Sequence, residues 1–398
     1  MKKSDKKRIA VITSTRAEYG LLYPLLKESL QDPLTDLQLL VSGTHLLKKY
    51  GYTMQDIRRD HIPVAGEIPI YDEDFVSDEV HVTAAAGRAA ITCGMLFERE
   101  RYDAVLVLGD RYELLGFCMA AVLCRIPIIH IHGGELTQGA LDDKIRHAVT
   151  KMASIHFPSI DRYARRIIQM GEDPARVYPV GALGIDSIMC TKLPDKAELF
   201  RELGIHSSLP VAVVTYHPVT GSHMETAKEE ITNVLEALLA AGLFAVITMP
   251  NADAGGDIIT KEILKYTARY GERMIFHKSL GRRRYLGLMK HADLMAGNSS
   301  GGILESASFR LPAVNIGSRQ KGRMAPENVI HCPCEKSSIE AALRQGLSRT
   351  FRDSLQNCKN PYGDGKAAQR ILSVIRETDF TDQTLISKKF YDMEQDVQ

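Results

Sequence analysis

Two short apolar runs in the first half of the chain end in residues that can transfer protons or bind phosphate. The run at 104–108 is followed by Gly109-Asp-Arg-Tyr-Glu113, and the run at 128–131 is followed by His132-Gly-Gly-Glu135. Short runs rich in Val and Ile indicate buried parallel strands, and open α/β sheets bind ligands at the carboxyl ends of their strands. Asp110 and Glu135 are therefore candidate acid–base groups, and Arg111 is a candidate phosphate clamp. The alternative role for Asp110 is a helix N-cap.

The histidines of the second run leave a metal site open as an alternative. His130 and His132 alternate along the expected strand, so both rings would lie on one side of it. With Glu135 and the acids Asp142 and Asp143 they could ligate zinc, but no second histidine pair stands at helical spacing. We expect no metal and no cofactor. We expect His130 to be a hydrogen-bonded core histidine and His132 and Glu135 to face the ligand.

Two further titratable residues lie at the ends of expected elements. Asp142 is expected just before a helix at 143–153, where its carboxylate is available for chemistry. Acids at a helix start are also favoured by the helix dipole alone. His217 ends the first strand of the second half, in Tyr216-His-Pro218, and a structural role and a functional role both fit it.

Two turns have the composition of anion sites. Gly297-Asn-Ser-Ser-Gly-Gly-Ile-Leu-Glu305 follows a strand and opens a helix, so its backbone amides and hydroxyls could bind a phosphate. An ordinary helix capped by Ser300 or Asn298 is the alternative, because Gly302 stands where a capping box needs Ser or Thr. The turn at 13–20 is either a second anion site containing Arg16 or a capped helix with a solvated arginine. The chain contains no Gly-x-x-x-x-Gly-Lys-Ser/Thr motif. No Gly-x-Gly-x-x-Gly follows the first strand, which disfavours nicotinamide and flavin enzymes.

The elements that must position these residues alternate between strands and helices. The first half has apolar runs at 8–13, 37–42, 104–108, 127–131, 155–158 and 177–180, and the second half has them at 211–216, 244–249, 274–276, 294–296, 313–316 and 329–331. Alternating strands and helices form parallel sheets covered on both faces. We therefore predict two Rossmann-like, doubly wound α/β domains at 1–185 and 186–365, with a helix and tail at 366–398, and a ligand in the cleft between the domains.

Composition excludes several classes of protein. The chain has 398 residues, is 44% hydrophobic and 25% charged, and carries a formal net charge of +1, which does not suggest a nucleic-acid partner. No run approaches the roughly 18–20 apolar residues that span a bilayer, and the first apolar run is too short for a signal peptide. Seven scattered cysteines indicate a reducing compartment. We expect a cytoplasmic enzyme.

The chain resembles the hydrolysing UDP-N-acetylglucosamine 2-epimerases of sialic-acid synthesis. The motifs that carry the resemblance are Gly109-Asp-Arg-Tyr-Glu, His130-Ile-His-Gly-Gly-Glu, Asp142-Asp-x-Ile-Arg-His-Ala, His217-Pro, Asn251-Ala-Asp, Gly297-Asn-Ser-Ser and Gly317-Ser-Arg-Gln-Lys-Gly-Arg. The resemblance implies the glycosyltransferase-B arrangement of two domains, with the last helix crossing back to the first. It implies conversion of UDP-N-acetylglucosamine and water to N-acetylmannosamine and UDP. Relatives act on UDP- or GDP-linked N,N'-diacetylbacillosamine, on the route to legionaminic acid.

The resemblance also implies roles for individual residues. Asp110 and Asp142 match catalytic carboxylates, and His217 matches a histidine near the leaving phosphate. The positions that match contacts to the nucleotide sugar are Arg16, Arg111, Asn251, Asn298, Ser299, Ser300, Glu305 and Arg319, with Glu305 on the ribose hydroxyls. Non-hydrolysing epimerases have His-x-Glu-Ala-Gly where this chain has His130-Ile-His-Gly-Gly-Glu, so either Glu135 or His132 is the base.

Three other functions remain open from the sequence. A glycosyltransferase of the same fold would need an acceptor, a non-hydrolysing epimerase would return a sugar still attached to UDP, and a nucleotide-sugar sensor would not need the acids. Free UDP formed without an acceptor would support the hydrolysing epimerase. We expect the nucleotide sugar as the ligand, no membrane partner, and a homodimer or homotetramer.

Overall fold

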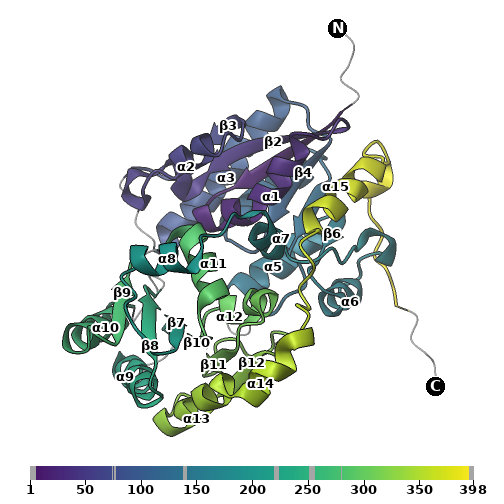
Figure 1. The fold of residues 1–398 in the computed structure, drawn as a ribbon. Helices are drawn as coiled ribbons and strands as arrows, with labels where there is room; N and C mark the ends of the chain where they lie inside the picture. Colours follow the sequence, from purple (N-terminus) through teal and green to yellow (C-terminus); the bar gives the residue numbers. More distant parts are fainter. Residues whose placement is uncertain are drawn as a thin grey trace. The chain divides into compact units, whose positions relative to one another are not determined.

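A computed structural model describes residues 6–73, 75, 78–137, 141–218, 224–250, 256–278 and 280–393. The chain forms two compact units (Figure 1). Met1–Met189 and Tyr362–Gln398 make up the first, and Cys190–Pro361 makes up the second. The first unit is therefore built from both ends of the sequence.

The first unit contains a parallel six-stranded sheet of order β3-β2-β1-β4-β5-β6. Its strands are β1 (Lys7–Thr13), β2 (Thr35–Ser42), β3 (Val64–Ile68), β4 (Ala104–Leu108), β5 (Ile128–Ile131) and β6 (Ile155–Phe157). Its helices are α1 (Arg16–Ser29), α2 (Met54–Arg59), α3 (Glu79–Arg99), α4 (Glu113–Leu123), α5 (Leu141–Met152), α6 (Asp161–Gln169), α7 (Leu183–Cys190) and α15 (Ala367–Glu377). The chain order reverses between β1 and β4, which is where doubly wound folds bind ligands.

Alternate residues of these strands enter two separate cores. Ile9 and Val11 of β1 pack with α1 and α15 on one face of the sheet. Ala10 and Ile12 pack with α3, α4 and α5 on the other. Because both faces are covered, central strands such as β4 and β5 are buried throughout, and a polar ligand can reach the sheet at its strand ends.

The second unit repeats the topology, with strand order β12-β11-β10-β7-β8-β9. Its strands are β7 (Val211–Thr215), β8 (Phe244–Thr248), β9 (Met274–His277), β10 (Leu294–Gly297), β11 (Ala313–Ile316) and β12 (Val329–Cys332). Its helices are α8 (Lys196–Glu202), α9 (Met224–Ala240), α10 (Gly256–Arg269), α11 (Gly281–His291), α12 (Gly301–Leu304), α13 (Lys336–Leu347) and α14 (Arg349–Ser354). Here the chain order reverses between β7 and β10, so the two doubly wound α/β folds expected from the sequence are confirmed.

One expected strand is wrong and one strand was missed. Residues 177–180 make a single bridge, from Val177 to His156, and form no strand. Pro179 lacks the N–H that a longer ladder would need. The sixth strand is instead β3, which pairs with β2 at the edge of the sheet. Its sequence, Val-Ala-Gly-Glu-Ile, is partly exposed and lacks the continuous apolar run by which the other strands were recognised.

Helix α3 is long and apolar enough, by length and composition, to cross a membrane. The sequence analysis did not expect such a segment. Ala85, Ala89, Cys93 and Phe97 of this helix are buried against the sheet. The helix therefore covers one face of the sheet.

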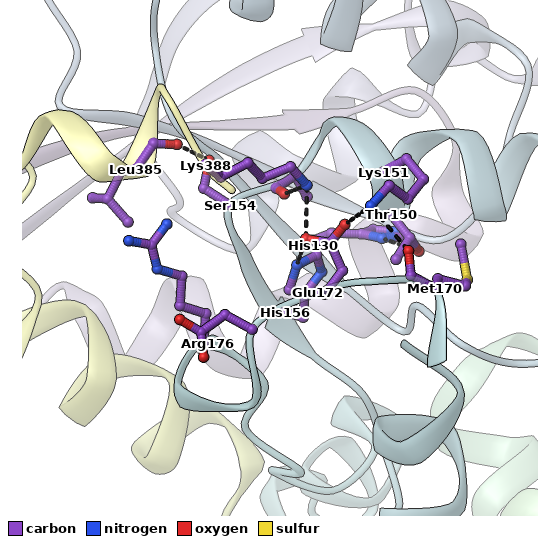
Figure 2. Close-up of polar contacts among 12 residues, drawn as sticks. His130, Thr150, Lys151, Ser154, His156, Met170, Glu172, Arg176, Leu385 and Lys388 are labelled. Atoms are coloured by element: carbon purple, nitrogen blue, oxygen red, sulfur yellow. Dashed lines mark hydrogen bonds and ion pairs between the residues drawn. The ribbon is translucent and has the colours of Figure 1, made fainter. Parts of the chain in front are cut away.

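The C-terminal segment is held on the first unit by charged and polar contacts. Figure 2 shows the Glu172 carboxylate between His156, Lys151 and Lys388. Lys388 Nζ lies 2.7 Å from the Glu172 Oε2 atom and donates to the Ala153 carbonyl at 2.6 Å. Although burial opposes the charged form, the hydrogen bonds from His156, Lys151 and Lys388 lower the pKa of Glu172 to about 2. The end of the chain is thus bound by a buried carboxylate.

Replacing Lys388 with methionine is expected to destabilise the first unit by about 1–3 kcal/mol, because the substitution removes a charged donor from a buried acceptor. Lys389→Met is the matched control, since Lys389 is the neighbouring lysine and is exposed. Urea unfolding followed by circular dichroism measures both. Equal midpoints for the two variants would contradict the anchoring role of Lys388.

Candidate active site

A buried arginine gathers the polar groups at the strand ends of the first unit. Arg146 of α5 is 3% exposed and forms an ion pair with Asp110, which follows β4. Its guanidinium also donates to the Glu135 carbonyl at 3.0 Å and to the Thr137 hydroxyl at 3.1 Å, and it lies 3.3 Å from an oxygen of Asp143. One side chain therefore fixes the loops after β4 and β5 relative to α5.

The structure excludes one of the two roles considered for Asp110, that of a helix cap. Helix α4 begins at Glu113 and its N-cap is Tyr112, with no side-chain capping bond. Asp110 is therefore not a helix cap. Its carboxylate is held by Arg146 and its side chain is 27% exposed. A carboxylate in a fixed orientation with an open side is suited to proton transfer.

The start of α5 differs from the expectation. The helix begins at Leu141, so Asp142 lies inside the first turn and not before it. Asp142 is exposed, whereas Asp143 accepts a hydrogen bond from the Thr137 amide at 2.8 Å and contacts Arg146. Thus Asp143, which the sequence analysis considered only as a zinc ligand, joins the Arg146 cluster. Asp142 remains a candidate and is exposed.

The two histidines of the β5 run have different environments. His130 is fully buried, its Nε2 atom lies 2.8 Å from the Gly109 carbonyl, and its Nδ1 atom lies 3.2 Å from the Thr150 hydroxyl. Burial lowers the pKa of His130 to about 3, so its ring is neutral. It is the core histidine expected from the sequence, and it supports the loop that carries Asp110.

His132 does not continue the alternation of the strand. Strand β5 ends at Ile131, and His132 adopts a left-handed φ of 64°. The expectation that His130 and His132 share one side of a strand is therefore wrong. Glu135 is 8% exposed and lies in the same loop. Among the described residues, no group of three or more His, Cys, Asp or Glu side chains is placed to hold a metal ion.

Arg111 belongs to a second polar network beside Asp110. Its guanidinium makes a bidentate pair with Glu113, at 2.7 Å and 3.1 Å. The Glu113 carboxylate is fully buried and accepts a hydrogen bond of 2.5 Å from the Tyr71 hydroxyl, which in turn lies 2.6 Å from the hydroxyl of Tyr112. Arg111 is thus oriented by a buried anion, which suits a guanidinium that must meet phosphate in a fixed geometry.

The turn after β1 has the features of a capped helix. Thr15 and Glu18 form a capping box, in which the Thr15 hydroxyl accepts from the Glu18 amide and Glu18 accepts from the Thr15 amide at 2.9 Å. Burial raises the pKa of Glu18 to about 7, against the opposing charge of Arg111. Arg16 is 61% exposed and lies 3.7 Å from Asp56. The turn is therefore a capped helix start with a solvated Arg16, whose guanidinium is accessible to a ligand.

The strand ends of the second unit are joined by one asparagine. Asn298 follows β10, is fully buried, and makes two hydrogen bonds to the backbone of His217 after β7, at 2.7 Å and 2.8 Å. The main-chain carbonyl of Asn298 accepts hydrogen bonds from the Gln320 side chain at 2.8 Å and from the Arg319 guanidinium at 3.4 Å. Asn298 is therefore a structural lock at the point where strand order reverses.

The His217 side chain is buried at the end of β7, beside Arg319. Burial and the nearby charge of Arg319 lower the pKa of His217 to about 4. Its imidazole is therefore neutral at physiological pH. A neutral ring beside an arginine can accept a proton or donate a hydrogen bond to an incoming anion.

The close approach of β7 and β10 requires glycine at 297. Gly297 has φ of 131°, and a Cβ atom there would overlap the Thr215 carbonyl oxygen. A side chain would push the Asn298 loop away from His217. The glycine after β10 thus serves the geometry of the strand ends and does not only leave room for an anion.

The rest of this loop and the short helix α12 lead to Glu305. Ser300 is the N-cap of α12 but makes no capping bond, and the Ser299 hydroxyl accepts from the Gly301 amide at 3.4 Å. The carboxyl group of Glu305 lies close to Gly301. Burial raises its pKa to about 7, partly offset by Arg282. Asn251 lies outside the described residues.

Replacing Asn298 with alanine is expected to weaken UDP binding by about tenfold, which corresponds to about 1.4 kcal/mol. The substitution leaves the His217 amide and carbonyl without their partners and releases the loop. Isothermal titration with UDP measures the loss. Asn233→Ala is the control, because it removes a single hydrogen bond of 3.2 Å from an asparagine of α9 to the Cys334 carbonyl and should change affinity less; a reversed order would contradict the lock.

Comparison with known proteins identifies the family. Residues 27–376 match the family model of UDP-N-acetylglucosamine 2-epimerase. The chain is 35% identical over 380 residues to UDP-N,N'-diacetylbacillosamine 2-epimerase (hydrolyzing) of Legionella pneumophila, covering 95% of this chain and 98% of the relative. It is 34% identical over 395 residues to polysialic acid biosynthesis protein P7 of Escherichia coli, covering 97% and 98%.

A third relative and a solved structure agree. The GDP/UDP-N,N'-diacetylbacillosamine 2-epimerase (hydrolyzing) of Campylobacter jejuni is 35% identical over 391 residues, covering 98% of this chain and all of the relative. The crystal structure of the Neisseria meningitidis UDP-GlcNAc 2-epimerase bound to UDP-GlcNAc superposes with a TM-score of 0.79 at 16% identity, covering 93% of this chain and all of that one. The structural match shows the shared fold. The chain belongs to the UDP-N-acetylglucosamine 2-epimerase family, on its branch of hydrolysing nucleotide-sugar 2-epimerases.

Proposed function

We propose that this chain converts UDP-N-acetylglucosamine and water to N-acetylmannosamine and UDP, for synthesis of sialic-type acids. The observation that carries the proposal is the Asp110 carboxylate at the end of β4, held by buried Arg146 in a chain of this family.

The reaction has two stages. The C2 proton of the sugar has no neighbouring carbonyl, so it becomes acidic only as the C1–O bond to UDP breaks. A base takes the C2 proton, UDP leaves, and a glycal with a C1–C2 double bond forms. Water then adds its oxygen to C1, and a proton returns to C2 on the opposite face. Inversion at C2 and hydrolysis at C1 result from one elimination and one addition.

The carboxylates of the first unit suit these proton transfers. Asp110 acts as one acid–base group, and Asp142 is proposed as the second, turning toward the bound sugar from the first turn of α5. The base at C2 is Glu135 or His132. Glu135→Gln and His132→Gln separate the two, because the substitution that removes the base loses more of the rate.

Cationic groups suit the departing diphosphate. Arg111, oriented by Glu113, and Arg319, beside His217, are proposed to contact it, with Arg16 at the rim. Ser299 and Ser300 would bind phosphate oxygens through their hydroxyls. The Glu305 carboxylate would accept hydrogen bonds from the ribose hydroxyls. Asn251 and Asn298 would make the remaining contacts to the substrate. With the charge of UDP met by arginines, the proposal needs no metal or other cofactor.

Two relatives named for N,N'-diacetylbacillosamine support a second substrate. The same elimination and addition would act on UDP- or GDP-linked diacetylbacillosamine and release a 6-deoxy sugar. Incubation with UDP-N-acetylglucosamine and with both diacetylbacillosamine nucleotides, followed by proton NMR, identifies the sugar. Release of a free 2-epimer supports hydrolysis. A product still linked to UDP would overturn the proposed hydrolysis and indicate a non-hydrolysing epimerase. Turnover only with an added acceptor would indicate a glycosyltransferase.

The proposal places the enzyme in the cytoplasm, where nucleotide sugars are made, and as a homodimer or homotetramer. Turnover after exhaustive chelation tests the absence of a metal requirement. If EDTA abolished the activity and zinc restored it, the enzyme would require a metal and this part of the proposal would be wrong.

A further inference from the structure

The loop of residues 132–135 carries both candidates for the base, so the anchoring of this loop bears on the chemistry. His132 has a left-handed φ of 64°, and its amide donates to the Phe157 carbonyl of β6 at 3.0 Å. The first residue of the loop is therefore held by the main chain of the sheet. Further along the loop, the carbonyls of Gly134 and Glu135 accept hydrogen bonds from arginine side chains of two helices.

Arg166 of α6 is the donor to Gly134. Its Nη1 atom hydrogen bonds to the Gly134 carbonyl, and its guanidinium carbon lies 5.7 Å from the centre of the Tyr163 ring on the same helix. A cation at that distance from an aromatic ring is attracted to it. Burial, followed by the charge of Arg162, lowers the pKa of Arg166, but an arginine remains protonated at physiological pH. The loop thus receives a charged donor whose side chain is itself held in place.

Two glycines allow the loop to lie directly on its supports. Gly134 has φ of 79°, and a Cβ atom there would come within 2.4 Å of the Tyr163 carbonyl oxygen on α6. A Cβ atom at Gly133 would lie 3.0 Å from the Nδ1 atom of His130. Glycine has wide backbone freedom and no side chain to pack. The direction of this part of the loop therefore depends on the hydrogen bonds made by its carbonyls.

The two arginines hold the peptide groups on either side of Glu135. The Gly134 carbonyl belongs to the peptide group before the Glu135 Cα atom, and the Glu135 carbonyl belongs to the one after it. Arg166 binds the first, and Arg146 binds the second at 3.0 Å. Because each peptide group is planar, fixing both of them sets the direction of the Cα–Cβ bond between them. The Glu135 side chain is therefore aimed by two helices.

We propose that Arg166 is a positioning residue that acts through Glu135 in the elimination step. Together with Arg146 it directs the Glu135 carboxylate toward the C2 proton of the bound sugar. This inference rests on the proposed function and deepens it, because it assigns the base to Glu135 and not to His132. The His132 amide is held by β6 and does not depend on either arginine.

Substitution of Arg166 in the full chain tests the positioning role. We expect Arg166→Met to lower kcat for sugar release by about tenfold, since a small misplacement of a catalytic group is costly, while UDP affinity stays within about twofold. Arg166→Lys should recover most of kcat, because a single carbonyl needs only one charged donor. Arg165→Met is the matched control, since it removes the same charge from the exposed neighbouring position of α6, and it should keep the wild-type kcat.

A double-mutant cycle tests whether Arg166 acts through Glu135. In a Glu135→Gln background, Arg166→Met should lower kcat little further, because the group that it positions is already gone. In a His132→Gln background the same substitution should still cost about tenfold, as in the wild type. An equal cost in both backgrounds, or a cost that disappears only with His132→Gln, would overturn the proposal. The substrate is UDP-N-acetylglucosamine, or the diacetylbacillosamine nucleotide if the wild type prefers it.

Hydrogen exchange read by mass spectrometry tests the anchoring without relying on activity. Amides of residues 133–137 should exchange faster in Arg166→Met than in Arg165→Met, and equal exchange would overturn the inference alone. Circular dichroism and thermal unfolding check folding, and Arg166→Gln replaces Arg166→Met if the latter does not fold. A wild type that releases no sugar from any of these nucleotides would instead overturn the proposed function, and the assignment of Glu135 with it.

Discussion

Asp110→Asn is expected to lower the rate of sugar release by about a hundredfold or more, the usual scale for one acid–base group. The amide keeps the size of the side chain but neither holds nor returns a proton at the reacting carbon. UDP affinity should stay within about threefold of wild type, because Asp110 is not among the proposed nucleotide contacts. Single-turnover release of sugar, followed by NMR, measures the rate, and titration with UDP measures the affinity.

The neighbouring acids provide the comparison for Asp110. Asp142→Asn should lose rate without losing stability, because Asp142 is exposed at the start of α5. Asp143→Asn should lower the free energy of unfolding more than Asp142→Asn does, because Asp143 contacts Arg146 and the Thr137 amide. If Asp110→Asn and Asp142→Asn both turn over at the wild-type rate, these carboxylates are structural and the proposed proton transfers are wrong.

Arg146→Met is expected to lower the free energy of unfolding by about 3–5 kcal/mol, the scale for removing one partner of a buried ion pair. The Asp110 carboxylate, the Asp143 carboxylate and the Glu135 carbonyl would all lose the donor that holds them. Activity should fall with it even at temperatures where the variant stays folded, because the loops after β4 and β5 are then no longer fixed.

Lys144→Met is the matched control, since it removes a positive charge from an exposed position on the same helix. Urea denaturation gives the stability of both variants, and kcat at 15 °C separates folding from positioning. An Arg146 variant with wild-type stability and kcat would show that the loops hold their shape without the guanidinium.

The sequence was sufficient for the strands that are buried on both faces. All six strands of the second unit were recognised, because runs such as Val211–Thr215 and Phe244–Thr248 are apolar up to their last residue. Edge strand β3 was missed because half of its residues face solvent, and a run containing Pro179 was mistaken for a strand. Apolar runs identify a parallel sheet from its centre outward, and its edges carry the least signal.

Part of the site followed from the sequence and part did not. Asp110 and Arg111 were found because they follow a strong strand signal. Arg146 was missed because an arginine inside a helix usually lies in solvent. Its position was nevertheless readable, since Ile145 and Val149 define the inward side of α5 and Arg146 lies on that side. The choice between Asp142 and Asp143 depended on a helix start, the kind of boundary that local pattern fixes least well.

Because the C-terminal segment belongs to the first unit, that unit cannot be completed until the whole chain has been synthesised. About 200 residues separate β6 from α15, which takes roughly 10–40 s at ~5–20 residues per second on the ribosome. Throughout that interval the apolar surface that Ile371 and Ile375 cover is open, and Glu172 lacks Lys388. A premature stop codon that removes only α15 and the tail would therefore damage the half of the protein that is made first.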